Sequence, residues 1–123
     1  MRDRLVGVEF SERDRVLIAT LEGEVDGSNA SELRLAISDR LPSSAAGLVL
    51  DIADVQYLDS SGVHLLFDLG RRLAARRQEL RLVIRADSPT RRVLDLCDIG
   101  AVAPMDGDLD AALAAIESDE VFG

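Results

Sequence analysis

The stretch GLVLDIADVQYLDSSGVHLLFDLGRRL, residues 47–73, joins two hydrophobic patterns and decides the fold. Its first seven residues, 47–53, are mostly apolar, as in a strand buried on both faces of a parallel sheet. After a short connection over residues 54–59, apolar side chains recur at helical spacing, and the chain then enters the arginine-rich segment RRLAARR, residues 71–77. Arginines at that end complement the helix dipole. The pattern predicts a strand, a turn and a long helix that begins near residue 60.

The residues before this stretch predict a hairpin and a first helix. Residues 4–10 (RLVGVEF) and 15–21 (RVLIATL) are β-type runs separated by the polar SERD. The segment GEVDG, residues 23–27, is expected to be a loop or a strand end. Apolar residues in 29–41 have the spacing of an amphipathic helix that ends before Pro42.

The residues after it predict two more strands and two more helices. Residues 79–85 (ELRLVIR) alternate as a strand, and Ser88 with Pro89 is a strong helix start. That helix is expected to run to about Cys97, followed by a short strand at 101–104, a helix over 108–116 and a frayed tail over 117–123.

This order predicts an α/β fold with right-handed crossovers. We expect a mixed sheet of four to five strands with about four helices mainly on one face. The length of 123 residues suits a single domain, with its core over about 4–116.

Composition excludes several classes of function. The net charge of −9 disfavours nucleic acid and anionic membranes as partners. All 14 basic residues are arginine, which removes mechanisms that need a lysine. One cysteine and one histidine cannot fill a zinc site, and no Walker-type phosphate loop is present, so we expect no metal and no cofactor. Residues 1–10 do not form a signal peptide and the longest apolar runs are short, so a cytoplasmic location is expected.

The functional candidate is the junction Asp59-Ser60-Ser61-Gly62, where a strand end meets a helix start. Either Asp59 or Ser60 is expected to cap the helix. A phosphate on Ser60 would face unpaired backbone N–H groups at the positive end of the helix, while Asp59 would oppose its charge. From these four residues alone, a plain helix cap is the commoner explanation.

Three segments together resemble the STAS domain family, which is typified by bacterial anti-sigma-factor antagonists. They are LEGEVD (residues 21–26), LVLDIADVQYLDSSG (residues 48–62) and SPTRRVLDL (residues 88–96). The resemblance covers nearly the whole chain, and the second segment is its most specific part.

The resemblance implies a partner switch and no enzymatic activity. In that family the serine after the aspartate, here Ser60, is phosphorylated by an anti-sigma factor that is itself a serine kinase, and Ser61 is a secondary site. A phosphatase would reset the switch. The implied partner-binding residues are Asp26, Asp59, Ser60, Ser61, Gly62 and His64. His64 departs from the small or apolar residue usual at that position of the family.

Other interpretations stay beside this one. A STAS domain can also be a non-switching scaffold or a subunit of a stress-signalling or lipid-transport assembly. A hydrolase that uses Ser60 and His64 lacks the G-x-S-x-G elbow and a second histidine, and a response-regulator receiver would need a lysine.

Two further features have simpler explanations. The arginines of residues 71–77 form a docking patch or, more simply, a solvated helix face. Cys97 is expected to be a buried small apolar residue.

Overall fold

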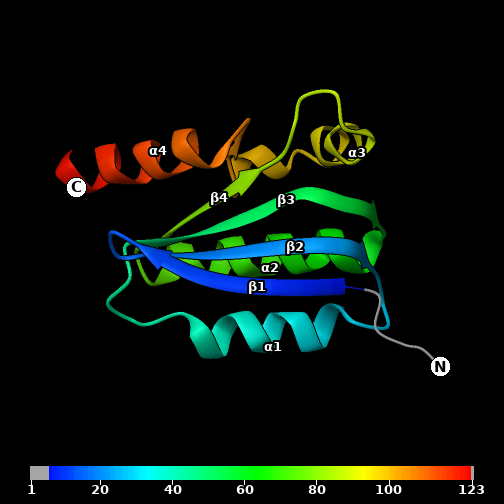
Figure 1. The fold of residues 1–123 in the computed structure, drawn as a ribbon, viewed down its shortest axis with the longest axis horizontal. Coiled ribbons are helices and arrows are strands. Elements are labelled where there is room, and N and C mark those ends of the chain that lie inside the picture. Colours follow the sequence, from blue (N-terminus) through cyan, green and yellow to red (C-terminus); the bar gives the residue numbers. More distant parts are fainter. Residues whose placement is uncertain (1–5, 123) are drawn as a thin grey trace.

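The computed structural model describes the backbone of residues 6–122 and the side chains of residues 7–118. Five strands form one sheet, accompanied by four α-helices and a 3-10 turn (Figure 1). Their order is β1 (Val6–Arg13), β2 (Val16–Val25), α1 (Ala30–Arg40), β3 (Gly47–Leu58), α2 (Ser60–Ala75), β4 (Glu79–Val83), α3 (Pro89–Leu96), η1 (Ile99–Ala101), β5 (Met105–Asp106) and α4 (Leu109–Phe122).

The sheet is mixed, with strand order β1-β2-β3-β4-β5. β1 and β2 pair antiparallel as a hairpin, and β2 to β5 are parallel neighbours. Because parallel neighbours need crossovers, α1, α2 and α3 each connect one strand to the next. The predicted fold class is confirmed.

β3 is longer than predicted, because residues 54–58 continue the strand instead of forming a connection. They pair with the end of β2 as far as Val25 opposite Leu58, after two register shifts. Val55 and Leu58 point into the core, whereas Gln56 and Tyr57 are exposed. Because these exposed residues interrupt the apolar run, the hydrophobic pattern alone does not indicate that the strand continues to Leu58.

The hairpin also differs from the prediction. The segment SERD is not a polar loop, since β1 runs to Arg13 and only Asp14 and Arg15 form the turn. Both have positive φ, 53° and 69°, as a two-residue hairpin turn requires. β2 likewise extends through GEV to Val25. Residues 4 and 5 of the predicted first strand lie outside the described residues.

The carboxyl-terminal part contains two more corrections. The last strand is Met105–Asp106 and not 101–104, because residues 99–101 form the turn η1, which buries Ile99. The predicted frayed tail is wrong as far as Phe122, since α4 continues to that residue. Gly123 lies outside the described residues.

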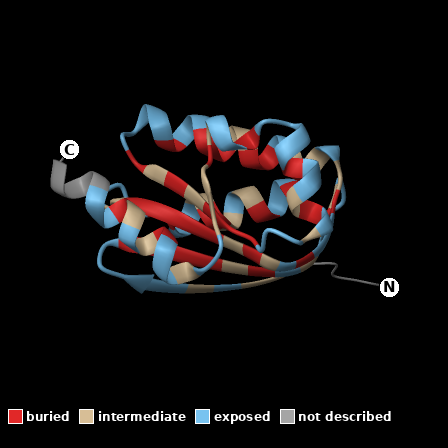
Figure 2. Cartoon of the chain, turned by 90° about the horizontal axis from the view of Figure 1, so that it is seen from above, coloured by how far each residue is buried: buried red, intermediate tan, exposed pale blue. Residues whose placement is uncertain are grey.

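The core has two parts, one on each face of the sheet (Figure 2). Alternate residues of β2 and β3, such as Leu48 and Leu50, point to the larger cluster beneath α1 and α2. Val49 points to the other face, where Ala112 and Ile116 of α4 cover it. Among the described residues, no helix combines the length and the apolar character needed to cross a membrane.

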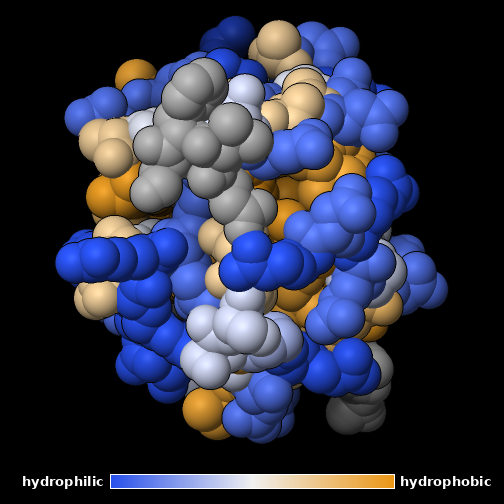
Figure 3. Space-filling model, turned by 90° about the vertical axis from the view of Figure 1, so that its left-hand side faces the viewer, coloured by the Kyte–Doolittle hydropathy of each residue, from blue (hydrophilic) through white to orange (hydrophobic). Residues whose placement is uncertain are grey.

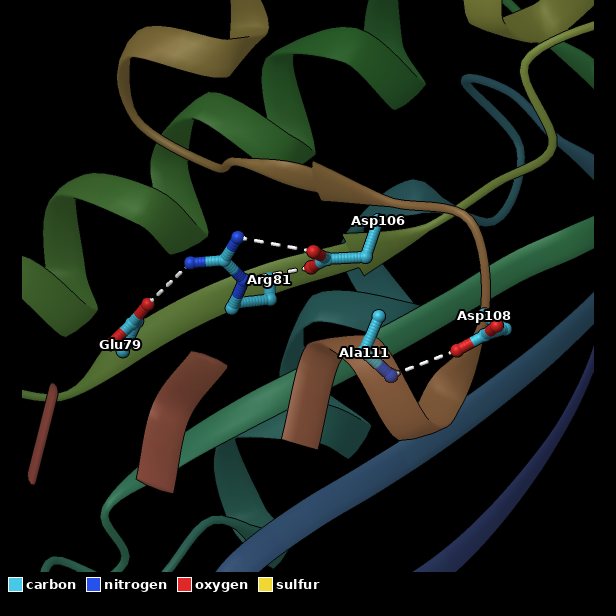
Figure 4. A network of polar contacts seen from close by, with 5 residues as sticks. All are labelled: Glu79, Arg81, Asp106, Asp108 and Ala111. Carbon is cyan, nitrogen blue, oxygen red and sulfur yellow. Dashed lines mark hydrogen bonds and ion pairs between the residues drawn. The ribbon is translucent and has the colours of Figure 1, made fainter. Parts of the chain in front are cut away.

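A network of charges fixes the edge strand β5 (Figure 4). The Arg81 guanidinium donates to both carboxylate oxygens of Asp106, at 2.7 and 3.2 Å, and to Glu79 at 2.8 Å. The hydrogen bond to Asp106 is the main reason that the pKa of Arg81 is raised. Next to it, Asp108 accepts from the Ala111 N–H at 2.8 Å and so caps the start of α4.

Replacing Asp106 with alanine is expected to lower the free energy of unfolding by about 1.5 to 3 kcal/mol, since both bonds involve a charged, largely buried guanidinium. Urea unfolding measures the loss. Asp110→Ala is the matched control, because its pair with Arg13 is long, 3.8 Å, and exposed. Equal stability of the two variants would contradict a structural role for Asp106.

Candidate functional site

The site lies where β2 and β3 end side by side. Val25 and Leu58 are register partners, and the Asp59 N–H donates to the Val25 carbonyl at 3.2 Å. Asp26 follows Val25 at the end of β2, and Asp59 and Ser60 follow Leu58 at the end of β3. The sheet therefore places the GEVD and DSSG segments, more than thirty residues apart in sequence, at the same edge.

Asp59 is the residue that caps α2. Its backbone is extended, with φ −94° and ψ −170°, and one carboxylate oxygen accepts from Ser61 N–H at 2.9 Å and Gly62 N–H at 3.1 Å. Ser60 is the first helical residue, and it is exposed. The expectation that a phosphate would face unpaired N–H groups is wrong for these two N–H groups, because Asp59 already occupies them.

The Asp26 turn is ordered by its own hydrogen bonds. One Asp26 oxygen accepts from the Ser28 N–H at 2.9 Å and the Ser28 hydroxyl at 2.6 Å, and these bonds lower the pKa of Asp26. Asn29, which is buried, accepts from the Asp26 N–H at 3.0 Å and donates to the Glu24 carbonyl at 2.9 Å. Sequence reasoning placed Asn29 only at a helix start and missed its role in shaping this turn.

Gly62 allows the start of α2 to approach β2 closely. A Cβ on Gly62 would lie 2.5 Å from Leu58 Cδ1 and 3.1 Å from the Val25 carbonyl oxygen. Gly27 meets the site from the other side, since its Cβ would lie 3.4 Å from Ser61 Oγ. Ser61 is therefore the more enclosed of the two serines, which the burial of each confirms.

A groove of about 680 Å³ runs between α1 and α2 from this site. Its polar lining includes Ser60, His64, Asp68 and Arg72 from α2, and Arg34 from α1. Asp68 pairs with Arg72 at 3.0 Å and with Arg34 at 3.9 Å. No sequence pattern points to Arg34 or Asp68, because their approach depends on how the two helices pack.

The remaining candidates lie elsewhere or differ from expectation. Cys97 is exposed, which corrects the buried role expected for it. It follows the last residue of α3, and the chain turns at Asp98 with φ 58°, so Ile99 fills the core position instead. Within the described residues, no three His, Cys, Asp or Glu side chains are grouped to hold a metal ion.

The arginine-rich end of α2 lies at the opposite end of the helix from Ser60. Arg76 and Arg77 line a groove of about 740 Å³ with Arg15 and Ile116. Figure 3 views the molecule from this end and shows mostly hydrophilic side chains with apolar surface between them. Sixteen residues of helix span about 24 Å, so these two arginines are remote from the serine.

Another groove, of about 920 Å³, also lies away from the serine. It runs along the second half of β3 and the start of α3, and its charged lining is mostly acidic: Glu22, Asp54, Asp87 and a single arginine, Arg85. None of the predicted site residues lines it, so size alone does not identify the functional site.

Comparison with known proteins gives a consistent result. A family model described as the STAS domain matches residues 8–112. BtrV of Bordetella bronchiseptica, named as an anti-sigma factor antagonist, is 25% identical over 105 residues, which cover 85% of this chain and 90% of BtrV.

Solved structures agree with the fold. An anti-sigma factor antagonist from Mycobacterium paratuberculosis is 28% identical, with a TM-score of 0.81 over 91% of this chain and 94% of that one. The Bacillus protein SpoIIAA, solved in its phosphorylated form, is 22% identical, with a TM-score of 0.65 over 89% of this chain and 99% of that one. At that identity the second likeness concerns the fold alone.

Proposed function

The chain belongs to the STAS domain family, and on this basis we propose that it is an anti-sigma-factor antagonist switched by phosphorylation of Ser60. The general role is supported by the two homologues named as anti-sigma factor antagonists, which align over most of this chain. The partner in this proposal is an anti-sigma factor with serine-kinase activity, and a phosphatase resets the switch.

One observation carries the choice of residue: Ser60 is exposed on the first turn of α2, beside the Asp26 turn. A kinase can reach its hydroxyl without unfolding the domain, because Asp59 and not Ser60 makes the capping bonds. Ser61 is a poorer substrate, since it is partly buried and faces Gly27. The same surface is open to a docking partner.

The switch operates through charge at this surface. Unphosphorylated, the Asp26 turn and the start of α2 dock on the kinase, which then releases its sigma factor. Phosphorylation adds about −1.5 to −2 charges beside Asp59. Because Asp59 already occupies the N–H groups of Ser61 and Gly62, these donors do not offset the new charge. Like charge and desolvation then weaken docking.

The test is an affinity pull-down from the source cell, followed by phosphosite mapping. We expect a serine kinase to co-purify with the protein and the phosphopeptide to carry its phosphate on Ser60. Ser60→Ala bait should retain the kinase and lose the phosphate. Recovery of a permease or a large assembly, with Ser60 unmodified, would contradict the switch and favour the scaffold or subunit role.

A further inference from the structure

Four polar residues of α2 form a stripe that faces α1. Ser60, His64, Asp68 and Arg72 are spaced by four residues, so each lies one helical turn from the next. All four line the groove between α1 and α2, together with Arg34. A group attached to Ser60 can therefore extend along this groove towards His64.

A phosphate on Ser60 needs more donors than the N–H groups of Ser61, Gly62 and Val63 can supply. The N–H groups of Ser61 and Gly62 are bonded to Asp59, and the Val63 N–H donates to the Asp59 carbonyl at 3.0 Å. Turned outward, the phosphate would face solvent beside the Asp59 carboxylate. Turning into the groove brings it towards an imidazole and a guanidinium.

Arg34 can move towards a phosphate without leaving Asp68 unpaired. Arg72 holds Asp68 at 3.0 Å, whereas the contact of Arg34 with Asp68 is at the limit of an ion pair, 3.9 Å. Two guanidinium groups against one carboxylate also leave the groove with a net positive charge, in a molecule of net charge −9. The groove is thus a positively charged region of a negatively charged molecule, which suits an anion.

We propose that the phosphate on Ser60 lies in the α1–α2 groove, where His64 and Arg34 bind it. The inference rests on the proposed function, since it concerns the same modified serine. His64 then binds the phosphate, and its imidazole has this role only when Ser60 is phosphorylated.

The charges around His64 set the sign of the expected effect. Arg34 faces it from α1, Asp68 and Arg72 follow it on α2, and Asp59 lies at the helix start. A cation beside the phosphate favours its dianion, whose second ionisation is ordinarily near pH 6. Binding by the Arg34 guanidinium and the His64 imidazole therefore lowers the pH at which the phosphate becomes a dianion.

The experiment uses the full chain with phosphoserine incorporated at position 60 during synthesis, so no kinase is needed. The ³¹P resonance of the phosphate is followed against pH at low salt in the parent and in the His64→Gln and Arg34→Gln variants. Each variant should raise the titration midpoint by roughly 0.2 to 0.7 pH units, the shift that corresponds to the loss of an exposed ion pair. Both variants together should raise it further, and added salt should reduce the differences.

Arg71→Gln is the matched control, because it removes the same charge from α2 but does not line the groove. Its midpoint should equal that of the parent. Because His64 is the sole histidine, its imidazole proton resonance should also shift when Ser60 is phosphorylated. Equal midpoints in all five proteins would overturn the inference and leave the switch untouched. Absence of phosphate at Ser60 in cells would instead overturn the switch, whatever the ³¹P titration shows.

Discussion

Ser60→Asp is expected to bind the kinase recovered in the pull-down at least tenfold more weakly than the wild type, while Ser60→Ala keeps wild-type affinity. A tenfold loss needs only about 1.4 kcal/mol. An acidic group of the docked partner about 8 Å from residue 60 would repel a carboxylate there by about 2 kcal/mol at an effective dielectric constant of about 20, which would suffice. Phosphoserine carries more charge than aspartate and should weaken binding further.

Isothermal titration or surface plasmon resonance at two salt concentrations measures this effect. Ser43→Asp is the matched control, because Ser43 is an exposed serine in the loop before β3 and lines the groove at the remote end of α2. It should bind like the wild type. The loss in Ser60→Asp should diminish as salt rises, since exposed charges are screened. Equal affinity of the wild type, Ser60→Ala and Ser60→Asp would refute the switch.

The order of the elements was predictable because each has a strong local signal. Residues 47–53 are mostly apolar, Ser88 caps α3 before Pro89, and Leu33 and Ile37 lie on the buried side of α1 as the spacing requires. The ends of the strands were less predictable. Residues 54–58 and 22–25 extend β3 and β2 because they pair with one another, which no local pattern in either segment reveals.

The same distinction, between local sequence patterns and contacts of distant segments, applies to the site. The DSSG segment could be found because a strand end followed by a helix start is a local pattern, yet the choice between Asp59 and Ser60 as the cap depended on backbone geometry. Arg34 could not be found from sequence. It lies on α1, and its place beside Asp68 comes from the packing of α1 against α2.

Gly62→Ala tests whether the close approach of α2 to β2 builds the site. The added Cβ would lie 2.5 Å from Leu58 Cδ1 and 2.9 Å from Leu58 Cγ, inside the core, and 3.1 Å from a backbone oxygen. Overpacking of this kind costs about 1 to 3 kcal/mol, and the better helix propensity of alanine returns up to about 1 kcal/mol. We expect the free energy of unfolding to fall by about 1 to 2 kcal/mol and partner binding to weaken, because the first turn of α2 carries Ser60.

Gly100→Ala separates this effect from a general effect of replacing glycine. A Cβ at Gly100 meets no atom within 4 Å, and its φ is not positive, so alanine there should leave stability unchanged or slightly higher. Urea unfolding compares the two variants, and binding is measured on folded protein at low temperature. Gly62→Ala could instead be as stable as Gly100→Ala and bind the partner like the wild type. Leu58 and the helix start would then adjust without lowering the free energy of unfolding, and the position of Ser60 would not depend on this contact. A loss of both stability and binding in Gly62→Ala alone would tie the docking surface to the packing of α2 against the ends of β2 and β3.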